Sequence, residues 1–569
     1  MRNTAKKVAR MIASLLCAHG VKEAVISPGS RNAPLIVAVE RHPRINTRVV
    51  IDERSAAFIA LGMSNAAGSL PVALVCTSGT AALNYAPAIA EAFYRHAPLV
   101  VITADRPSEW IDQDDSQTIK QPGIYNNFIK GSFDIPVESD EPDRMWMINR
   151  TVNDAISLAT DGLPGPVHIN VRLADPLGDI EEIDDNDTYG DEARCINICG
   201  NSYQIDPASI ASLSEQIKSP AKVLVLAGFM EPCGLDDALN RLAQQPNIVV
   251  MHEAQSNLHK NNTFISNIDA TLRYIGAELD ERYTPDIVIT LGGSLTSRMV
   301  KEWLRRCPSL KHWSIGVNDH AIDCFRKLAL RLSVPPAIAM KALADGLENR
   351  QQAEILEFKQ YWLDAKIKSF ESAEEWAQNS PWCDFKAVHS LLKAMPERYN
   401  LQLSNGTAVR YVQLFDYSKA SRIDCNRGVS GIDGCTSTAI GAALMSRNPT
   451  VLITGDMSMQ YDIGALACTF IPDNFKIVVL NNGGGGIFRF IRTTRNLEEL
   501  QRDFVADVRL PLAKLSEAYG FNYYSAADES EFNHVITDFF EDNYRPSILE
   551  IVTDGEISAS NLRKFFGTK

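Results

Sequence analysis

The sequence predicts an α/β protein built from three doubly wound parallel-sheet domains. Its 569 residues exceed what one hydrophobic core organises, and at roughly 100 to 200 residues per domain they fit about three domains. Hydrophobic residues make up 45% and charged residues 22% of the chain, the balance of a folded globular protein. Short β-branched runs alternate with Gly- or Ser-containing turns and helical patterns, which is typical of parallel βαβ units.

The first predicted domain spans residues 1–180. Residues 1–20 are basic with apolar residues at helical spacing, and they lack the long apolar run and cleavage site of a signal peptide, so we predict an amphipathic helix. Strands are predicted at residues 23–29, 48–53, 71–79, 98–107 and 166–171. An acidic, strand-poor stretch at 179–193 is interpreted as a linker.

The second and third predicted domains span residues 195–345 and 375–569. In the central domain, strands are predicted at residues 222–229, 247–253, 286–294 and 312–318. A charged helical stretch at about 340–380 closes it. The third domain has predicted strands at residues 399–406, 450–456, 475–484 and 547–553.

No strand is followed by GxGxxG and a well-spaced acidic residue, so a nicotinamide or flavin oxidoreductase is disfavoured and the central domain is interpreted as a scaffold or a regulatory surface.

Charge and apolar content restrict the partners and the location. Lys and Arg number 56 against 70 Asp and Glu, a net charge of −14, which argues against nucleic acid and anionic membranes as partners. No apolar run approaches the roughly 18 residues of a membrane span, so no membrane insertion is expected. The eleven cysteines form no CxxC pair, which favours reduced thiols and a cytoplasmic location.

Two strand ends in the third domain carry residues suited to a diphosphate and a metal ion. One strand ends in Gly455-Asp456, and the other in Asn481, Asn482 and four glycines. Ligands of such sheets bind at the carboxyl ends of the strands, and Mg²⁺ prefers oxygen ligands. The Asp456 carboxylate, the Asn482 amide oxygen and the Gly484 carbonyl would supply three, for Mg²⁺ or Mn²⁺. Either stretch alone is more typical of a turn with a helix cap.

Arginines follow several predicted strands. They are Arg31, Arg106, Arg298, Arg410 and Arg427. Guanidinium groups bind carboxylates in bidentate fashion, so several at one site favour a substrate with more than one carboxylate. A single one of these arginines is more typical of a structural ion pair.

The paired strand ends resemble the fingerprint of the thiamine-diphosphate superfamily that includes decarboxylases and acetolactate synthases. Segments along all three domains are similar to one family within it, the 2-succinyl-5-enolpyruvyl-6-hydroxy-3-cyclohexene-1-carboxylate synthases of menaquinone (vitamin K2) biosynthesis. These segments are SPGSRNAPL, IDER, TSGTAALN, TADRP, SQTIKQPG, CNRGVSGIDG, GDMSMQYD and NNGGGGIF, in this order between residues 27 and 488. The resemblance implies three domains of the thiamine-diphosphate enzyme type, binding the pyrimidine in the first domain and the diphosphate and metal in the third.

The resemblance also implies a reaction and an assembly. Thiamine diphosphate and a divalent metal would serve the decarboxylation of 2-oxoglutarate and the 1,4-addition of the succinyl-semialdehyde carbanion to isochorismate. Active sites in the superfamily are shared between subunits, so a homo-oligomer, dimer or tetramer, is expected. The alternative is another carboligase of the acetolactate synthase or glyoxylate type, and a third class, a catalytically silent cofactor-binding subunit, is disfavoured because Glu53, Asp456 and Asn482 are present.

The superfamily takes its activating glutamate from a strand end in the first domain. Here the segment RVVIDERSAAFIALG offers Glu53, followed by a helix of small residues that would pack closely, and Asp52 competes for the role. The resemblance assigns cofactor contacts to Glu53, Ser78, Gly406, Thr407, Ile432, Gly455, Asp456, Met457, Ser458, Asn482, Gly484, Gly485 and Ile487. Ile432 would support the bent cofactor. Ser78 and Thr80 would lie in the pocket on the pyrimidine side, although a role as strand-end caps fits them almost as well.

The resemblance divides the polar substrate contacts between the outer domains. Arg410 and Arg427 would hold carboxylates near the thiazolium, and Arg31, Arg106 and Gln117 would line the isochorismate side. The sequence departs from the family pattern in three ways. Gly483 stands where a third Asn is usual, and the Ser usual near Gly406 and the Asn usual near Ser116 are absent. Arg298 stands alone where the family has two adjoining basic residues.

Overall fold

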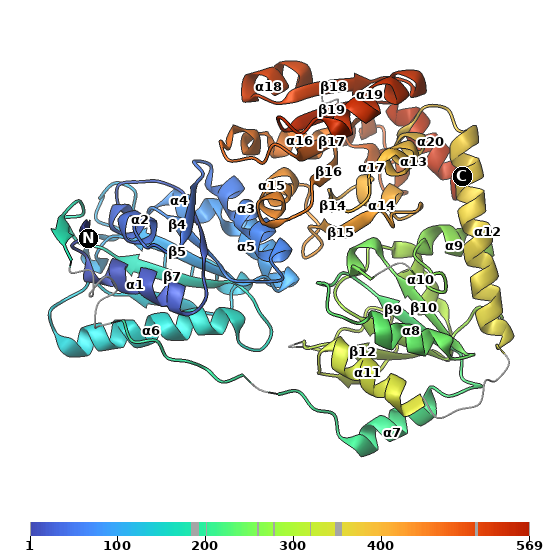
Figure 1. The fold of residues 1–569 in the computed structure, drawn as a ribbon, viewed down its shortest axis with the longest axis horizontal. Helices are drawn as coiled ribbons and strands as arrows, with labels where there is room; N and C mark the ends of the chain where they lie inside the picture. Colours follow the sequence, from blue (N-terminus) through green and yellow to red (C-terminus); the bar gives the residue numbers. More distant parts are fainter. Residues whose placement is uncertain are drawn as a thin grey trace. The chain divides into compact units, whose positions relative to one another are not determined.

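A computed structural model gives the fold of the chain (Figure 1). It describes residues 2–183, 193–200, 202–258, 261–276, 279–318, 320–347, 355–506 and 510–567. The chain forms two compact units. Unit 1 comprises residues 1–201, 428–447 and 461–472, and unit 2 comprises residues 202–427, 448–460 and 473–569. The predicted α/β fold is confirmed, since the described residues form three parallel sheets with helices around them.

Unit 1 contains a six-stranded parallel sheet. Its order is β3 (Asn46–Val49), β2 (Glu23–Ile26), β4 (Val72–Cys76), β5 (Leu99–Asp105), β7 (Val167–Arg172), β6 (Ser132–Ile135). Strands β4 and β5 are wholly buried, as expected when both faces of a parallel sheet are covered. The helices of the unit are α1 (Lys7–Ala18), α2 (Ala33–Glu40), α3 (Glu53–Ala66), α4 (Thr80–Asn84), α5 (Ala86–Arg95), α6 (Pro142–Thr160) and α15 (Cys435–Met445).

Helices α3 and α15 approach each other through glycines. A Cβ atom at Gly62 would lie 1.9 Å from the main-chain oxygen of Thr438. A Cβ atom at Gly441 would lie 2.0 Å from the main-chain oxygen of Ile59. Each helix therefore presents a glycine to the backbone of the other, and the close packing expected for the small-residue helix is confirmed.

Unit 2 contains two further parallel sheets (Figure 1). The five-stranded sheet has the order β10 (Ile248–His252), β9 (Val223–Ala227), β11 (Ile287–Leu291), β12 (Lys311–Ile315), β13 (Leu328–Leu332). The six-stranded sheet has the order β15 (Ala420–Cys425), β14 (Tyr399–Leu403), β16 (Thr450–Gly455), β17 (Phe475–Asn481), β19 (Ser547–Val552), β18 (Asn522–Ala526). Numbered along the chain, its strands follow the same order as those of the unit 1 sheet: second, first, third, fourth, sixth, fifth.

The helices of unit 2 connect and cover these sheets. Around the five-stranded sheet they are α7 (Pro207–Gln216), α8 (Asp236–Gln244), α9 (Ile268–Ile275), α10 (Arg298–Arg306), α11 (Pro336–Leu347) and α12 (Glu357–Asn379). Around the six-stranded sheet they are α13 (Asp384–Ala394), α14 (Ala408–Val412), α16 (Asp456–Tyr461), α17 (Gly486–Phe490), α18 (Leu512–Tyr519), α19 (Glu529–Glu541) and α20 (Gly555–Phe565). Helices α11 and α12 confirm the helical character predicted for residues 340–380, within the described residues.

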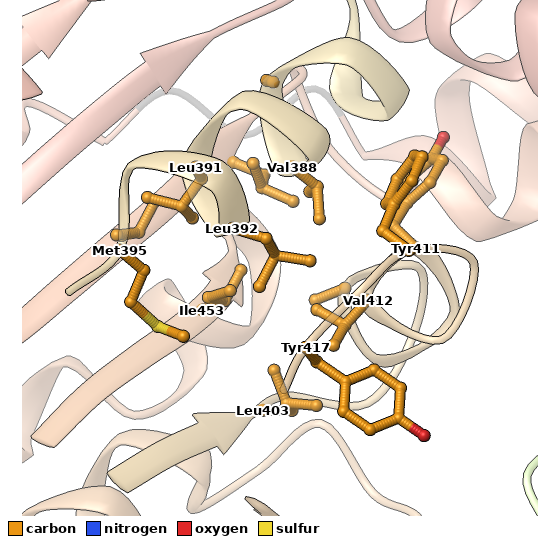
Figure 2. Packing of buried hydrophobic residues seen from close by; sticks show 14 of the residues in the cluster. Val388, Leu391, Leu392, Met395, Leu403, Tyr411, Val412, Tyr417 and Ile453 are labelled. Carbon is orange, nitrogen blue, oxygen red and sulfur yellow. The ribbon is translucent and has the colours of Figure 1, made fainter. Parts of the chain in front are cut away.

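A buried apolar cluster fixes the six-stranded sheet of unit 2 to its helices. Figure 2 shows side chains of α13, among them Leu391 and Leu392, gathered with Leu403 of β14 and Ile453 of β16. All four side chains are 3% exposed or less. This packing holds α13, and with it Asp384 at the start of that helix, against β14 and β16.

Two sequence expectations need correction. The predicted strand at 48–53 lies earlier, at β3, because Asp52 caps α3. The predicted linker at 179–193 begins as a strand, β8 (Ile180–Glu182), which pairs antiparallel with β1 (Arg2–Thr4) ahead of the predicted first helix; residues 184–192 of that linker lie outside the described part of the chain. Among the helices that the structure describes, none combines the length and the apolar character needed to cross a bilayer.

Candidate functional site

The two strand ends predicted to bind diphosphate and metal lie together in unit 2. Strands β16 and β17 are neighbours, and the Gly484 N–H donates a hydrogen bond of 2.7 Å to Oδ2 of Asp456. The Met457 N–H donates to Oδ1 of the same carboxylate at 2.7 Å. Asp456 is 2% exposed, and burial raises its pKa to about 6 against the opposing effect of these N–H groups, with the Asp384 charge raising it further.

Asn482 is the second predicted metal ligand, and its two amide atoms differ in environment. Its Nδ2 donates a hydrogen bond of 2.7 Å to Oδ2 of Asp384. Its Oδ1 is buried and has no hydrogen-bond partner among the described residues. A buried acceptor without a partner is costly, and a hard cation is the kind of group that satisfies it.

The glycine run after Asn482 turns the chain back toward Asp456. Gly484 has φ +122°, and a Cβ atom there would lie 2.2 Å from the main-chain oxygen of Val505, so only glycine fits. Its carbonyl, the third predicted ligand, accepts a hydrogen bond of 2.8 Å from the Gly486 N–H. The Gly485 N–H is occupied by the Val505 carbonyl at 2.9 Å.

The surroundings of these residues have room for a ligand. A cavity of about 560 Å³ lies at the carboxyl ends of β17 and β19, lined by Asn481, Asn482, Gly483, Arg489, Gln501, Val552, Thr553, Asp554, Gly555 and Glu556. A Cβ atom at Gly455 would meet nothing within 4 Å. Ser458 is buried and Ile487 is half-buried on the helices that follow the two strands. The orphaned Asn482 oxygen beside a buried carboxylate therefore fits a divalent cation.

The neighbouring strand end, after β14, brings two predicted arginines together. The strand order reverses between β14 and β16, which is where ligands bind in such sheets. Gly406, at φ +97°, and Thr407 lead into α14, where Arg410 donates through Nη1 to the Gly406 carbonyl. Burial lowers the pKa of Arg410, and the nearby charge of Arg427 lowers it further.

Arg427 is 7% exposed and only partly satisfied. Its Nη1 donates a hydrogen bond of 2.9 Å to Oδ1 of Asn405, whereas its Nε is buried and has no partner among the described residues. A guanidinium with an unmatched buried donor, close to a second guanidinium, fits a carboxylate. Asn405 was missed by the sequence analysis, although it directly precedes the predicted Gly406.

Two buried carboxylates, also missed, lie near these arginines: Glu253, directly after β10, and Asp269, on α9. Glu253 accepts the N–H groups of Thr296 and Ser297 at 2.7 and 2.6 Å. Burial raises the pKa of Glu253, and the Arg427 charge opposes that shift. Burial likewise raises the pKa of Asp269, which the Arg410 charge opposes. No motif marks either residue, because their partners lie far away in the sequence.

Arg298 is not brought to this arginine pair by any contact that the structure records for it. It is the first residue of α10, and its side chain is 82% exposed. Its Nε lies 2.8 Å from Oε1 of Glu302, one turn along the same helix. Arg298 therefore behaves as a surface ion pair, the alternative considered for any single arginine of the set.

In unit 1, Asp52 and Glu53 take different positions at the start of α3. Asp52 is the N-cap, and its Oδ1 accepts the N–H groups of Arg54 at 3.0 Å and Ser55 at 3.3 Å. Glu53 is half-buried, and its Oε2 accepts a hydrogen bond of 3.4 Å from Asn84 Nδ2. Because Asp52 serves the cap, the Glu53 carboxylate is not needed for it.

The loop after β4 carries the predicted pyrimidine-side residues. Ser78 is 2% exposed, whereas Thr80 is exposed as the first residue of α4. Gly79 has φ +81°, and a Cβ atom there would lie 3.2 Å from the main-chain oxygen of Gln117. Gln117 is exposed and has φ +54°, so the predicted substrate residue packs its backbone against the pyrimidine-side loop.

Arg31 and Arg106 each bind main-chain carbonyls within unit 1. Arg31 is 7% exposed and donates through Nη1 to the Leu173 carbonyl at 3.1 Å. Arg106 donates through Nε and Nη2 to the Ser116 carbonyl at 3.1 and 2.9 Å, and its Nε lies 2.8 Å from Oδ2 of Asp115. Arg106 thereby fixes the loop that carries Gln117.

The segment that carries Ile432 is anchored in unit 1. Glu91 of α5 is 3% exposed and accepts the N–H groups of Gly428 at 2.7 Å and Val429 at 2.6 Å. Ile432 itself is partly buried. The predicted site residues thus divide between the units, with Glu53, Ser78 and Ile432 in unit 1 and Asp456 and Asn482 in unit 2.

Comparison with known proteins places the chain among its relatives. Residues 6–124 match the family described as the N-terminal TPP binding domain of thiamine pyrophosphate enzymes, and residues 406–551 match the corresponding C-terminal domain. The chain is 36% identical to a 2-succinyl-5-enolpyruvyl-6-hydroxy-3-cyclohexene-1-carboxylate synthase of Porphyromonas gingivalis, over 99% of this chain and 97% of the relative. It is 35% identical to the synthase of that name from Christiangramia forsetii and 36% identical to that of Flavobacterium psychrophilum, each over 98% of both chains.

Proposed function

This chain belongs to the family of 2-succinyl-5-enolpyruvyl-6-hydroxy-3-cyclohexene-1-carboxylate synthases, which are thiamine pyrophosphate enzymes, and we propose that it performs the reaction of their name. In this reaction 2-oxoglutarate loses carbon dioxide, and the remaining four-carbon unit adds to isochorismate in a 1,4-addition. The proposal is supported by full-length similarity to enzymes of this name together with the buried, partly unsatisfied arginine of unit 2. The reaction belongs to menaquinone biosynthesis.

We propose that the end of β16 and the glycine run after β17 hold the cofactor's diphosphate through a divalent cation, Mg²⁺ or Mn²⁺. Asp456, Asn482 and Gly484 are the proposed ligands, and the orphaned Oδ1 of Asn482 is the observation that supports them. Thiamine diphosphate supplies the electron sink for decarboxylation and carbon–carbon bond formation. Gly406, Thr407 and Ser458 are the further proposed contacts on the diphosphate side.

The chain's own residues then have three tasks. Glu53 holds a proton at the aminopyrimidine ring, a role for which Asp52 is unsuited because it caps α3. Arg410 and Arg427 bind substrate carboxylates, since their charges lie close together and the Arg427 Nε lacks a partner. Arg31, Arg106 and Gln117 orient isochorismate. Positioning two polyanionic substrates is the main contribution of the protein to such a reaction.

We further propose a homo-oligomer in which active sites are shared between subunits. The support for it is the chain's similarity to thiamine pyrophosphate enzymes, with Glu53 in the N-terminal and Asp456 in the C-terminal TPP binding domain. Closed symmetric assemblies are the usual form of such oligomers.

Product formation from defined substrates tests the proposed reaction. The purified protein, supplied with thiamine diphosphate and Mg²⁺, should form the named product from 2-oxoglutarate and isochorismate together, with release of carbon dioxide, as followed by mass spectrometry. Omitting thiamine diphosphate is the control for background. Turnover of pyruvate alone, without turnover of 2-oxoglutarate, would instead support the acetolactate synthase type of carboligase.

A further inference from the structure

We propose that Asp384 is a positioning residue of the metal site, which fixes the Asn482 amide so that its oxygen faces the cation. The inference rests on the proposed function, because it takes Asn482 as a ligand. Asp384 lies 98 residues before Asn482 in the sequence, at the start of α13.

The hydrogen bond between the two side chains sets the direction of the amide. Asn482 Nδ2 donates to Asp384 Oδ2 at 2.7 Å. The reverse orientation would bring two oxygen atoms together and lose the bond, so the amide has one favoured orientation here. In that orientation Oδ1 points away from Asp384 and is the atom without a partner.

Asp384 is itself held from two sides. Thr553, just after β19, donates through Oγ1 to Asp384 Oδ1 at 2.5 Å. The main-chain N–H of Asp384 donates to Oγ of Ser558 at 3.1 Å, on α20. The side chain is 1% exposed, so the carboxylate has little freedom to turn.

Both oxygens of Asp384 are therefore occupied by protein donors, one by Thr553 and one by Asn482. A cation bound at Asn482 Oδ1 would lie on the side of the amide that faces away from Asp384, because the amide nitrogen is the atom that faces this carboxylate. The geometry therefore favours positioning over direct ligation. Groups that orient a metal ligand in this way typically change metal affinity by 10- to 100-fold when they are removed.

Titration calorimetry with MgCl₂ at saturating thiamine diphosphate tests the role without measuring turnover. Asp384→Leu removes both acceptors while keeping the branching and the number of side-chain heavy atoms, and we expect the Mg²⁺ dissociation constant to rise about 10- to 100-fold. Asp384→Asn keeps an oxygen that accepts from the Asn482 amide, and its new NH₂ group donates to the Thr553 hydroxyl, which becomes the acceptor. The Mg²⁺ affinity of this variant should therefore stay near that of the wild type. Asp456→Ala should show no Mg²⁺-dependent binding.

Asp462→Leu is the matched control. Asp462 is equally buried and accepts a main-chain N–H at 2.6 Å and a hydroxyl at 2.8 Å, both from Ser437, and it belongs to unit 1, whereas Asn482 belongs to unit 2. Its variant should lose stability in denaturant unfolding while keeping the wild-type Mg²⁺ affinity. If Asp384→Leu does not fold, Asp384→Ala, which leaves space for water, takes its place, and we expect the same rise in the Mg²⁺ dissociation constant.

The outcomes separate the inference from its premise. Wild-type Mg²⁺ affinity in folded Asp384→Leu or Asp384→Ala would overturn the positioning role alone. A loss in Asp384→Asn as complete as that in Asp456→Ala would also overturn it, because Asp384 would then be a ligand. If the wild-type protein bound no Mg²⁺ with thiamine diphosphate, the proposed cofactor site would fail, and this inference with it.

Discussion

Asp52 and Glu53 are adjacent carboxylates with different hydrogen-bond partners. Oδ1 of Asp52 accepts two N–H groups at the start of α3, and Oε2 of Glu53 accepts a hydrogen bond of 3.4 Å from the Asn84 amide. A carboxylate used as a helix cap is poorly placed to exchange a proton with a ligand. We therefore propose Glu53 for the proton-transfer role.

Replacement of Glu53 by glutamine should separate binding from turnover. Glu53→Gln keeps the size of the side chain but cannot exchange the proton, so thiamine diphosphate affinity should be largely retained while turnover falls about 10²- to 10⁴-fold. Calorimetry and steady-state assays measure the two quantities. Asp52→Asn, which preserves the cap, is the control and should keep wild-type turnover. Near-normal activity of Glu53→Gln would remove this residue from the mechanism.

At the residue scale the sequence predicts the proposed metal ligands better than the buried polar residues that lie around the candidate site. Asp456 and Asn482 stand out because each ends an apolar strand next to glycines. Asp384, Glu253 and Asn405 carry no such mark, since a buried hydrogen bond between residues far apart in the chain leaves no spacing pattern. Such partners become visible only when the fold brings them together.

At the scale of elements, the contact between α3 and α15 leaves no space for a Cβ atom at Gly62 or Gly441. Gly441→Ala would normally stabilise a helix by about 1 kcal/mol through propensity. Here the added Cβ meets the Ile59 carbonyl at 2.0 Å, so we expect the variant to lose about 3 kcal/mol, the upper part of the usual overpacking range. Denaturant unfolding measures the change.

Gly178→Ala is the control for this substitution, because a Cβ atom there meets nothing within 4 Å. It should leave the free energy of unfolding nearly unchanged. If both variants were equally stable, the two helices would have room to separate, and the close approach would not be a constraint on the sequence.

Whether a strand was predicted depended on how deeply it is buried. Interior strands such as β5 and β17 are buried along nearly their whole length and appear as continuous apolar runs. The strands that were not predicted in the three parallel sheets are β6, β13, β15 and β18, and each lies at the edge of its sheet. These four strands are only partly buried, as LALRL in β13 is, so they lack the apolar run that marks a buried strand, whereas the edge strand β10 is wholly buried and was predicted.

At the scale of the whole molecule, the division of cofactor residues between units makes a complementation experiment decisive for the proposed assembly. Co-expression of Glu53→Gln and Asp456→Ala chains with different tags, followed by tandem purification, isolates mixed oligomers. If sites are shared between two subunits, a mixed dimer holds one site with both wild-type residues and one with neither. We therefore expect about half of the wild-type activity per dimer.

Each variant purified alone is the control for complementation and should be nearly inactive. Absence of activity in the mixed oligomer would contradict shared sites and place Glu53 and Asp456 of one chain in the same site. A single species of one chain in sedimentation experiments would contradict the oligomer itself.

The common strand order of the two six-stranded sheets has an evolutionary consequence. Each strand end in one sheet has a topological counterpart in the other, so the loop with Ser78 after β4 corresponds to Asp456 after β16, and Arg106 after β5 corresponds to Asn482 after β17. This is the outcome expected of an ancestral gene duplication. Under the proposed function, the unit 2 sheet anchors a diphosphate through a cation at these strand ends, whereas the unit 1 sheet contributes the proton chemistry.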